Sequence, residues 1–316
     1  MSEEMIATRH AYGEALLEIG GVNTKVVALD ADVSTCTMSC FFGDKHCGRF
    51  INVGIAEANM IGMAAGMATL DLIPFVHSFA MFTAGRGFDQ IRNSIAYPGL
   101  NVKVVGTHAG LTIGEDGPTH QCLEDIGLMR TIPGMTIVCP ADGPETRAAV
   151  KAITDYKGPV YLRLGRLAVK TVTGGADYSF TLGKAATMRD GKDATIIATG
   201  MMVQLALEAA EKLAGQGVNA RVLNMHTIKP LDADAVLAAA RETGAIVTAE
   251  EHNVLCGLGG AVAELLSQNY PVPVMRVGVN DVFGKSGAPE DLLKRYNLTS
   301  DAIVEKVMAA IKMKKA

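Results

Sequence analysis

Short apolar runs alternate with amphipathic stretches along the whole chain. The apolar runs are four to six residues long and rich in valine and isoleucine, as at residues 25–29 and 194–199. Strands that alternate with helices form parallel sheets with helices on both faces. The pattern therefore predicts an α/β fold.

A break in the middle of the chain divides this pattern in two. Residues 171–183 are polar, contain glycine and have no strong periodicity, which predicts a linker. The length of 316 residues also suits two domains. We expect two doubly wound domains with parallel or mixed sheets, at residues 1–174 and 184–316, joined by residues 175–183. The expected strands are residues 25–29, 50–53, 73–76, 102–106, 136–139, 160–164, 194–199, 220–224, 245–249 and 272–277, and the expected helices are 57–70, 87–96, 144–154, 203–214, 234–241, 260–268 and 300–313.

Composition excludes several classes of protein. The net charge is −4, no basic block occurs and tryptophan is absent, which argues against a nucleic-acid-binding surface. The most apolar stretch, residues 60–70, is too short to span a bilayer, so we expect no membrane segment. The charged N-terminal residues do not resemble a signal peptide, and we expect a cytoplasmic protein.

The six cysteines predict neither disulfides nor a metal centre. None forms a C-x-x-C pair, and a chain of this size does not need a disulfide framework. Cys36, Cys40, His46 and Cys47 cluster, but they lack the paired short spacings of a zinc site. We therefore expect free thiols and no metal ligands on this chain.

The carboxyl ends of parallel strands, where ligands bind in such sheets, point to the first domain. The segment THAGLTIGEDGPTHQ at residues 107–121 contains His108 and His120 on either side of Glu115 and Asp116. Imidazoles titrate near neutrality and suit proton transfer to sugar hydroxyls or carbonyls. A solvated loop whose charges only aid solubility is the alternative.

Glu57 is an isolated carboxylate at the start of a nearly uncharged helix. Such a residue ordinarily caps the helix or complements its dipole, but the apolar neighbours here would desolvate the carboxylate. Gly62 and Gly66 predict close contact with another helix, either across a subunit interface or inside the domain. Phe79 and Phe82 suit a core or a platform for a ring.

Together these motifs resemble the C-terminal portion of transketolase over essentially all 316 residues. The matches are GEDGPTHQ at residues 114–121, the G-I-x-E turn at 54–57, Thr8-Arg9, Ala31-Asp32 and GPVYLRLGR at 158–166. The resemblance implies a pyrimidine-binding domain at residues 1–174. It also implies a C-terminal domain at residues 184–316 that serves in dimerisation and packing.

The resemblance implies thiamine diphosphate as cofactor. Glu57 would be the carboxylate that activates the cofactor through its pyrimidine N1′ atom. Phe79 and Phe82 match the pocket for the pyrimidine ring, and Asp32 matches a residue near the thiazolium ring.

The resemblance also assigns substrate contacts. His108, Asp116 and His120 match groups that bind and protonate the oxygens of the sugar. Arg9 and Arg166 match a pair that binds the substrate phosphate. Two positions depart from the family: Gly85 stands where a tyrosine is usual, and Cys36 stands where a phosphate-binding serine is usual, with Ser34 nearby.

The family's metal motif is missing from this chain. Thiamine enzymes hold the diphosphate through Mg²⁺ or Ca²⁺ bound by a G-D-G motif and a later asparagine, and no GDG occurs here. We therefore expect an N-terminal partner subunit that carries this motif, an active site between the two chains, activity only in the complex, and an α2β2 heterotetramer.

The expected activity is transfer of a two-carbon ketol unit from a ketose phosphate to an aldose phosphate, as in the pentose phosphate pathway. A β subunit of a 2-oxo acid dehydrogenase and a deoxyxylulose phosphate synthase-like enzyme are the alternatives, and a scaffold subunit with a degenerate site is a third. In the second domain, Glu250-Glu251-His252 is interpreted as a polar strand-end loop at an interface rather than a catalytic trio.

Overall fold

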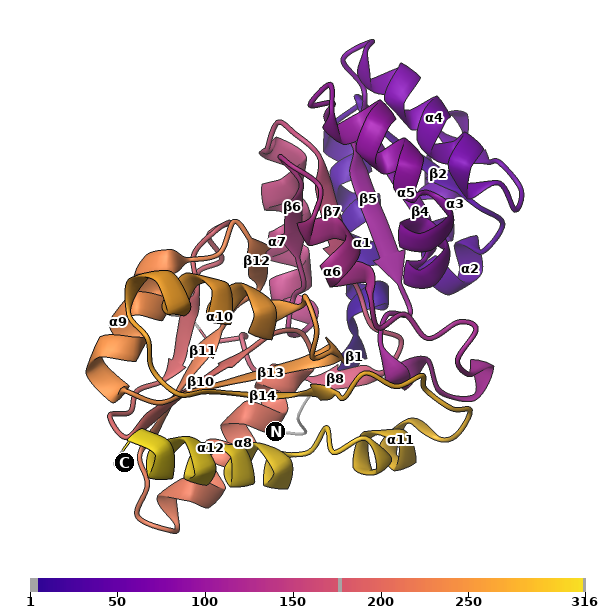
Figure 1. Cartoon of the computed structure of the whole chain (residues 1–316). Coiled ribbons are helices and arrows are strands. Elements are labelled where there is room, and N and C mark those ends of the chain that lie inside the picture. Colours follow the sequence, from indigo (N-terminus) through magenta and orange to yellow (C-terminus); the bar gives the residue numbers. More distant parts are fainter. Residues whose placement is uncertain (1–4, 176–177, 315–316) are drawn as a thin grey trace.

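Two layered α/β halves follow one another along the chain (Figure 1). The computed structural model describes residues 5–175 and 178–314. Each half is built mainly on one sheet, and both sheets are mainly parallel, as the alternating pattern predicts. Within those described ranges, no helix is both long and apolar enough to cross a bilayer.

The first sheet has seven strands. Its order is β12-β6-β7-β5-β4-β2-β3, and all neighbours are parallel except β12, which runs antiparallel to β6. β12 comes from the second half of the chain, so the two halves share this sheet. The strands are β2 (Val26–Asp30), β3 (Phe50–Asn52), β4 (Ile73–Phe79), β5 (Lys103–Thr107), β6 (Thr136–Val138), β7 (Val160–Arg163) and β12 (Thr227–Lys229).

Alternate residues of these strands pack against helices on opposite faces, because successive side chains of a strand point to opposite sides. Val26 and Ala28 join the core under one helical layer, and Val27 and Leu29 join the core under the other. The first layer contains α1 (Thr8–Val22), α3 (Cys40–Lys45) and α7 (Gly143–Asp155), and the second contains α4 (Glu57–Ala68), η3 (Ile91–Ala96) and α6 (Asp125–Arg130).

The second sheet has five strands in the order β14-β13-β10-β11-β9. Only β9 runs antiparallel to its neighbour. One face packs against α8 (Met202–Ala214) and α12 (Ser300–Lys314), the other against α9 (Ala233–Thr243) and α10 (Leu258–Asn269). The strands are β9 (Ala186–Arg189), β10 (Ala194–Ala198), β11 (Ala220–Asn224), β13 (Ile246–Asn253) and β14 (Val274–Val279).

A two-stranded ladder joins the start of the chain to the end of the first half. β1 (Met5–Ala7) pairs antiparallel with β8 (Ala168–Lys170). The ladder places Thr8 beside Gly165, whose amide donates to the Thr8 hydroxyl at 2.9 Å. The arginines that follow these two residues are thereby brought to the same edge of the sheet.

The remaining elements are short, and several depart from the sequence predictions. The helix expected at residues 87–96 is part of a longer helical run with wide turns, and residues 111–116 of the expected loop form a 3₁₀ helix. These elements are α2 (Ser34–Thr37), η1 (Cys47–Arg49), η2 (Met81–Arg86), α5 (Phe88–Gln90), η4 (Leu111–Asp116) and α11 (Pro289–Arg295).

The segment expected as a linker is tied to the first half. The buried carboxylate of Asp142, at the start of α7, accepts hydrogen bonds from the amides of Val172 and Thr173, both at 2.6 Å. The Tyr178 hydroxyl donates to Glu145 in the first turn of α7. The domain boundaries at residues 174 and 184 stay a prediction.

Candidate active site

Glu57 lies at the start of α4, as the sequence predicts, and its side chain is almost fully buried. Its Oε1 atom accepts a hydrogen bond from Arg86 Nη1 at 3.0 Å, and the Ser78 hydroxyl lies 3.4 Å from the same atom. Only 4% of the Glu57 side chain is exposed, against 51% for Arg86. The buried carboxylate is therefore neutralised from the solvent side by one arginine.

An aromatic pair lies beside this carboxylate. Phe79 ends β4 and Phe82 follows in η2, and their rings stack with centroids 5.9 Å apart and an interplanar angle of 17°. The Arg86 guanidinium lies 4.1 Å from the Phe82 centroid. Gly85, at the position where the family usually has a tyrosine, is exposed. The predicted ring platform and the predicted carboxylate thus share one place, with Arg86 touching both.

His108 joins this group from the end of β5. Its ring centroid is 4.1 Å from that of Phe79, and its Nδ1 atom is 2.9 Å from the Thr107 hydroxyl. Burial, reinforced by the positive charges of Arg9 and Arg166, lowers the pKa of His108 to about 3. This corrects the expectation that this imidazole titrates near neutrality: His108 stays neutral at physiological pH.

His120 approaches the aromatic pair from the other end of the same segment. Its ring is 5.2 Å from Phe82 and 6.3 Å from Phe79, in both cases edge to face. The structure therefore brings His108 and His120 to the same pair of rings, although twelve positions separate them along the chain.

The two arginines lie near His108, at the same end of the β1–β8 ladder. Arg9 donates from Nη1 to the carbonyl of Cys36 at 2.6 Å, and burial together with the charge of Arg166 lowers the pKa of Arg9. Arg166 donates to the carbonyl of Ile113 at 2.5 Å, and its Nη1 atom is 3.5 Å from Asp116 Oδ2. Two cations that raise each other's energy form a natural site for an anion.

Asp32 lies in the turn after β2 and Ser34 begins α2, and Asp30 organises this region. The buried Asp30 carboxylate accepts from the Val33 amide at 2.6 Å and from the Thr37 hydroxyl at 2.7 Å. Asp32 has a positive φ of 66° and accepts from Asn52 at 2.9 Å. These contacts tie Asp32 to β3 rather than to Glu57 or the aromatic pair.

Arg86 is the site residue that sequence reasoning did not single out. A signal was present, because Arg86 is the single Asp, Glu, Lys or Arg between residues 72 and 88. A lone charge in an apolar segment calls for a partner, and here the partner is the equally isolated Glu57.

The cysteine cluster does not assemble into a metal centre. Cys36, Cys40 and Cys47 are free thiols, as are the three other cysteines. In the part of the chain that the structure describes, no group of three or more His, Cys, Asp or Glu side chains is arranged to hold a metal ion.

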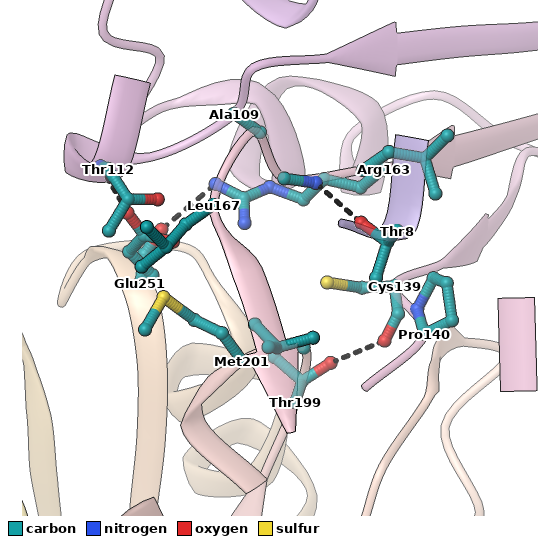
Figure 2. Close-up of a pocket in the computed structure, with 14 residues that line it drawn as sticks. Thr8, Ala109, Thr112, Cys139, Pro140, Arg163, Leu167, Thr199, Met201 and Glu251 are labelled. Atoms are coloured by element: carbon teal, nitrogen blue, oxygen red, sulfur yellow. Dashed lines mark hydrogen bonds between the residues drawn. The ribbon is translucent and has the colours of Figure 1, made fainter. Parts of the chain in front are cut away.

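Beneath the site, the junction between the two halves is polar and buried (Figure 2). Arg163, at the end of β7, donates from Nε to Asp125 at 2.8 Å and from Nη2 to the carbonyl of Glu251 at 2.9 Å. Glu250, Glu251 and His252 belong to β13 itself and are buried, whereas we expected a loop after the strand. Glu251 and His252 contact the first half of the chain, through the Thr112 and Gly127 amides respectively, whereas Glu250 bonds within the second half.

Family profiles match most of the chain. The profile of the transketolase pyrimidine-binding domain matches residues 4–171, and that of the transketolase C-terminal domain matches residues 183–303.

Curated relatives and a solved structure agree with these profiles. The chain is 50% identical over 296 residues to the 6-deoxy-6-sulfo-D-fructose transketolase subunit SqwH of Clostridium sp. (strain MSTE9), covering 94% of this chain and 92% of that protein. It is 40% identical over 312 residues to an apulose-4-phosphate transketolase subunit of Phocaeicola vulgatus, covering 99% and 100%. With the transketolase of Rattus norvegicus it shares 39% identity over 312 residues, which are 98% of this chain but 49% of that enzyme. A solved structure described as a split gene transketolase, inactive beta4 tetramer, superposes with a TM-score of 0.91 at 50% identity, covering 98% of this chain and 99% of the other.

Proposed function

This chain belongs to the transketolase family, and on that premise we propose that it is the C-terminal subunit of a two-chain transketolase. The reaction is transfer of a two-carbon ketol unit from a ketose phosphate to an aldose phosphate. The observation that carries the proposal is the convergence of Glu57, the stacked phenylalanines and both histidines at one edge of the first sheet.

The residues present fit the pyrimidine half of thiamine diphosphate. A planar aminopyrimidine suits the Phe79–Phe82 pair, and the buried Glu57 carboxylate beside it is placed to hold a proton at a ring nitrogen. Asp32 would face the thiazolium end. When bound, the cofactor supplies the nucleophilic carbon that attacks the ketose carbonyl.

The chain's own residues then orient the sugar. His108, neutral at physiological pH, can accept or donate one hydrogen bond to a sugar oxygen without bringing a charge. His120, which is partly exposed, and Asp116 bind further oxygens, and His120 moves a proton at the reacting end.

Arg9 and Arg166 would bind the anionic end of the substrate. Ser34 would contribute from the same short helix as Cys36, whose carbonyl accepts from Arg9. Planar guanidinium groups bind tetrahedral oxyanions through two donors each. The sugars after which two relatives are named, 6-deoxy-6-sulfofructose and apulose 4-phosphate, bear a sulfonate and a phosphate, and both groups suit this pair.

The diphosphate end of the cofactor and its Mg²⁺ or Ca²⁺ require a partner. We propose an N-terminal subunit with a G-D-G motif and a later asparagine, assembled with this chain as α2β2 in the cytoplasm. Two observations support the partner subunit: no GDG occurs in this sequence, and the chain spans about half of the rat enzyme.

The test is reconstitution. We expect the chain alone to show no ketol transfer, and the chain mixed with its N-terminal partner, thiamine diphosphate and Mg²⁺ to transfer ketol units. The assay would compare xylulose 5-phosphate, 6-deoxy-6-sulfofructose and apulose 4-phosphate as donors, each with a phosphorylated aldose. Full activity of this chain alone would disprove the two-chain proposal, and decarboxylation of 2-oxo acids in place of ketol transfer would disprove the reaction.

A Glu57→Gln variant provides the site control. It keeps the size of the side chain but removes the carboxylate that shares a proton with the cofactor, so we expect assembly with the partner to persist and most activity to be lost. Near-normal turnover would remove Glu57 from the proposed site.

A further inference from the structure

Glu251, on β13 of the second half, touches the segment that carries His108. Its Oε1 atom accepts a hydrogen bond from the Thr112 amide at 2.7 Å, and only 5% of the residue is exposed. A Cβ atom added at Gly110 would lie 2.3 Å from the Glu251 carboxyl carbon. The carboxylate therefore fills the concave side of residues 108–112, which we call the His108 segment.

The His108 segment needs such support because its backbone is strained. His108 has a φ of 57° and Gly110 a φ of 86°, and a histidine in this region persists only where the surroundings enforce it. Glycine is required at position 110 for a second reason as well, because any side chain there would collide with Glu251. Sequence-distant residues thus fix the conformation that aims the imidazole at Phe79.

Glu251 is itself held rigidly. Arg163, which lies beside Glu251 in Figure 2, donates to the Glu251 backbone carbonyl at 2.9 Å. Arg163 also pairs with the buried Asp125 at 2.8 Å. Burial raises the pKa of Glu251, and the nearby Arg163 charge opposes that rise. A side chain fixed in this way on β13 holds the His108 segment at a set distance from the second sheet.

The small cavity at this junction supports the same conclusion. Its lining includes Thr8, Ala109 and Gly165, the chain neighbours of Arg9, His108 and Arg166 respectively. About 30 Å³ is open to a water-sized sphere, far too little for a sugar. The junction therefore supports the residues proposed to contact the substrate and is not itself a second sugar-binding site.

We propose that Glu251 is a positioning residue of the transferase site: through the Thr112 amide it holds the His108 segment in the geometry that binds the sugar. This inference rests on the proposed function and gives the second half, which carries no residue of the proposed site, an indirect part in substrate binding. It also assigns a role to the central residue of the Glu250-Glu251-His252 motif.

The test is a pair of substitutions read by hydrogen exchange and by kinetics. We expect Glu251→Ala to raise amide exchange across residues 108–116 and to lower kcat/KM for sugar phosphates, each by roughly tenfold, because one charge-assisted buried hydrogen bond is lost. Glu251→Gln keeps an oxygen that can accept from Thr112, so it should recover most of both effects.

Glu250 provides a matched control. It is the adjacent buried glutamate, but it accepts from the amides of Leu258 at 2.7 Å and Gly259 at 2.8 Å, inside its own half. We expect Glu250→Ala to leave exchange across residues 108–116 and kcat/KM unchanged, even if it lowers thermal stability.

The outcomes separate this inference from the proposed function. Unchanged exchange across residues 108–116 in a folded Glu251→Ala chain, or equal effects of Glu250→Ala and Glu251→Ala on kcat/KM, would overturn the positioning role. Absence of ketol transfer by the wild-type complex would count against the proposed function, while hydrogen exchange would still decide whether Glu251 holds the segment.

Discussion

At the scale of single residues, the contact between Glu57 and Arg86 has two consequences. It pairs a carboxylate that the fold buries with a cation that stays half in solvent, and it holds that cation over Phe82. Arg86 thus compensates the cost of placing a carboxylate in an apolar pocket before any cofactor arrives.

We predict that Arg86→Met lowers the free energy of unfolding by about 1 kcal/mol, a figure that allows for the half-exposed arginine. The reason is that a buried carboxylate loses its charged partner. The measurement is urea unfolding of the isolated chain. In the double variant with Glu57→Gln the loss should largely disappear, and additive effects of the two substitutions would show that the pair is not coupled.

His108 predicts a pH dependence of stability. Histidine in the unfolded chain binds a proton near pH 6.5, whereas folded His108 does so only near pH 3. The unfolded state therefore binds more protons between these values, and stability falls as the pH decreases through that window. Compared with His108→Asn, the wild type should lose up to about 2 kcal/mol more between about pH 7.5 and about pH 5. Parallel losses in both proteins would contradict the lowered pKa.

Arg9 and Arg166 predict anion binding by the chain without its partner. Inorganic phosphate should raise the melting temperature of the wild type, because it relieves the repulsion between the two cations. Arg166→Ala should remove most of that rise. Arg147→Ala is the control, since Arg147 pairs with Glu14 away from the site. Equal shifts in all three proteins would indicate non-specific binding.

Residue types and motif order were sufficient to nominate most of the proposed site, because many of its side chains follow the ends of short apolar runs that predict strands. Their contacts were not predictable in the same way. The Glu57–Arg86 pair and the neutrality of His108 depend on burial and on charges brought together by long-range folding, and neither property has a local sequence signature.

At the scale of elements, the segment that connects the halves is held by side-chain hydrogen bonds to α7. Tyr178 and Asn224 both donate to the Glu145 carboxylate, one from the connecting segment and one from β11. Burial raises the pKa of Glu145 to about 7. Because the folded pKa lies above the unfolded one, stability is lost as the pH rises from about 4.5 to about 7.

We predict that Tyr178→Phe destabilises the chain by about 1 kcal/mol at pH 8 but less at pH 5, since the ionised carboxylate depends most on its donors. The measurement is the urea midpoint at both pH values. Tyr97→Phe, at a residue that is 90% exposed, should change neither midpoint. A Tyr178→Phe effect that does not vary with pH would contradict this role of Glu145.

The elements that were not predicted from the sequence share one property: their local sequence signal is weak. α1 contains three glycines and a weak apolar stripe, so its pattern is not recognisably helical. β1, β8 and β12 are three residues long and are defined by partners far away in sequence. By contrast, the long apolar strands and the well-patterned α7, α8 and α9 were predicted within a few residues.

At the scale of the whole molecule, α4 presents an open glycine face. Positions Gly62 and Gly66 have nothing within 4 Å of an added Cβ atom, and Ile55 and Leu70 at either end of the helix are each 75% exposed. Sequence reasoning left open whether the glycines pack inside the domain. The alternative that these glycines pack inside the domain is wrong, because no other part of the described chain covers Gly62 or Gly66.

We predict that Gly62→Leu weakens self-association while slightly stabilising the helix, since leucine has about 1 kcal/mol better helix propensity than glycine. Sedimentation velocity would report the oligomer and circular dichroism the fold. Gly215→Leu, in the turn after α8, is a control remote from α4. Unchanged association of the Gly62 variant would place the interface elsewhere.

The shared first sheet limits how this polypeptide can be recombined. β12 pairs with β6, and Lys229 adds bonds to the carbonyls of Arg130 at 2.8 Å and Ile132 at 2.6 Å. A fragment that ends near residue 174 would leave β6 as an uncovered edge, which favours aggregation. A chimaera that takes its two halves from different relatives must therefore inherit β6 and β12 from the same parent, although more than eighty residues separate them along the chain.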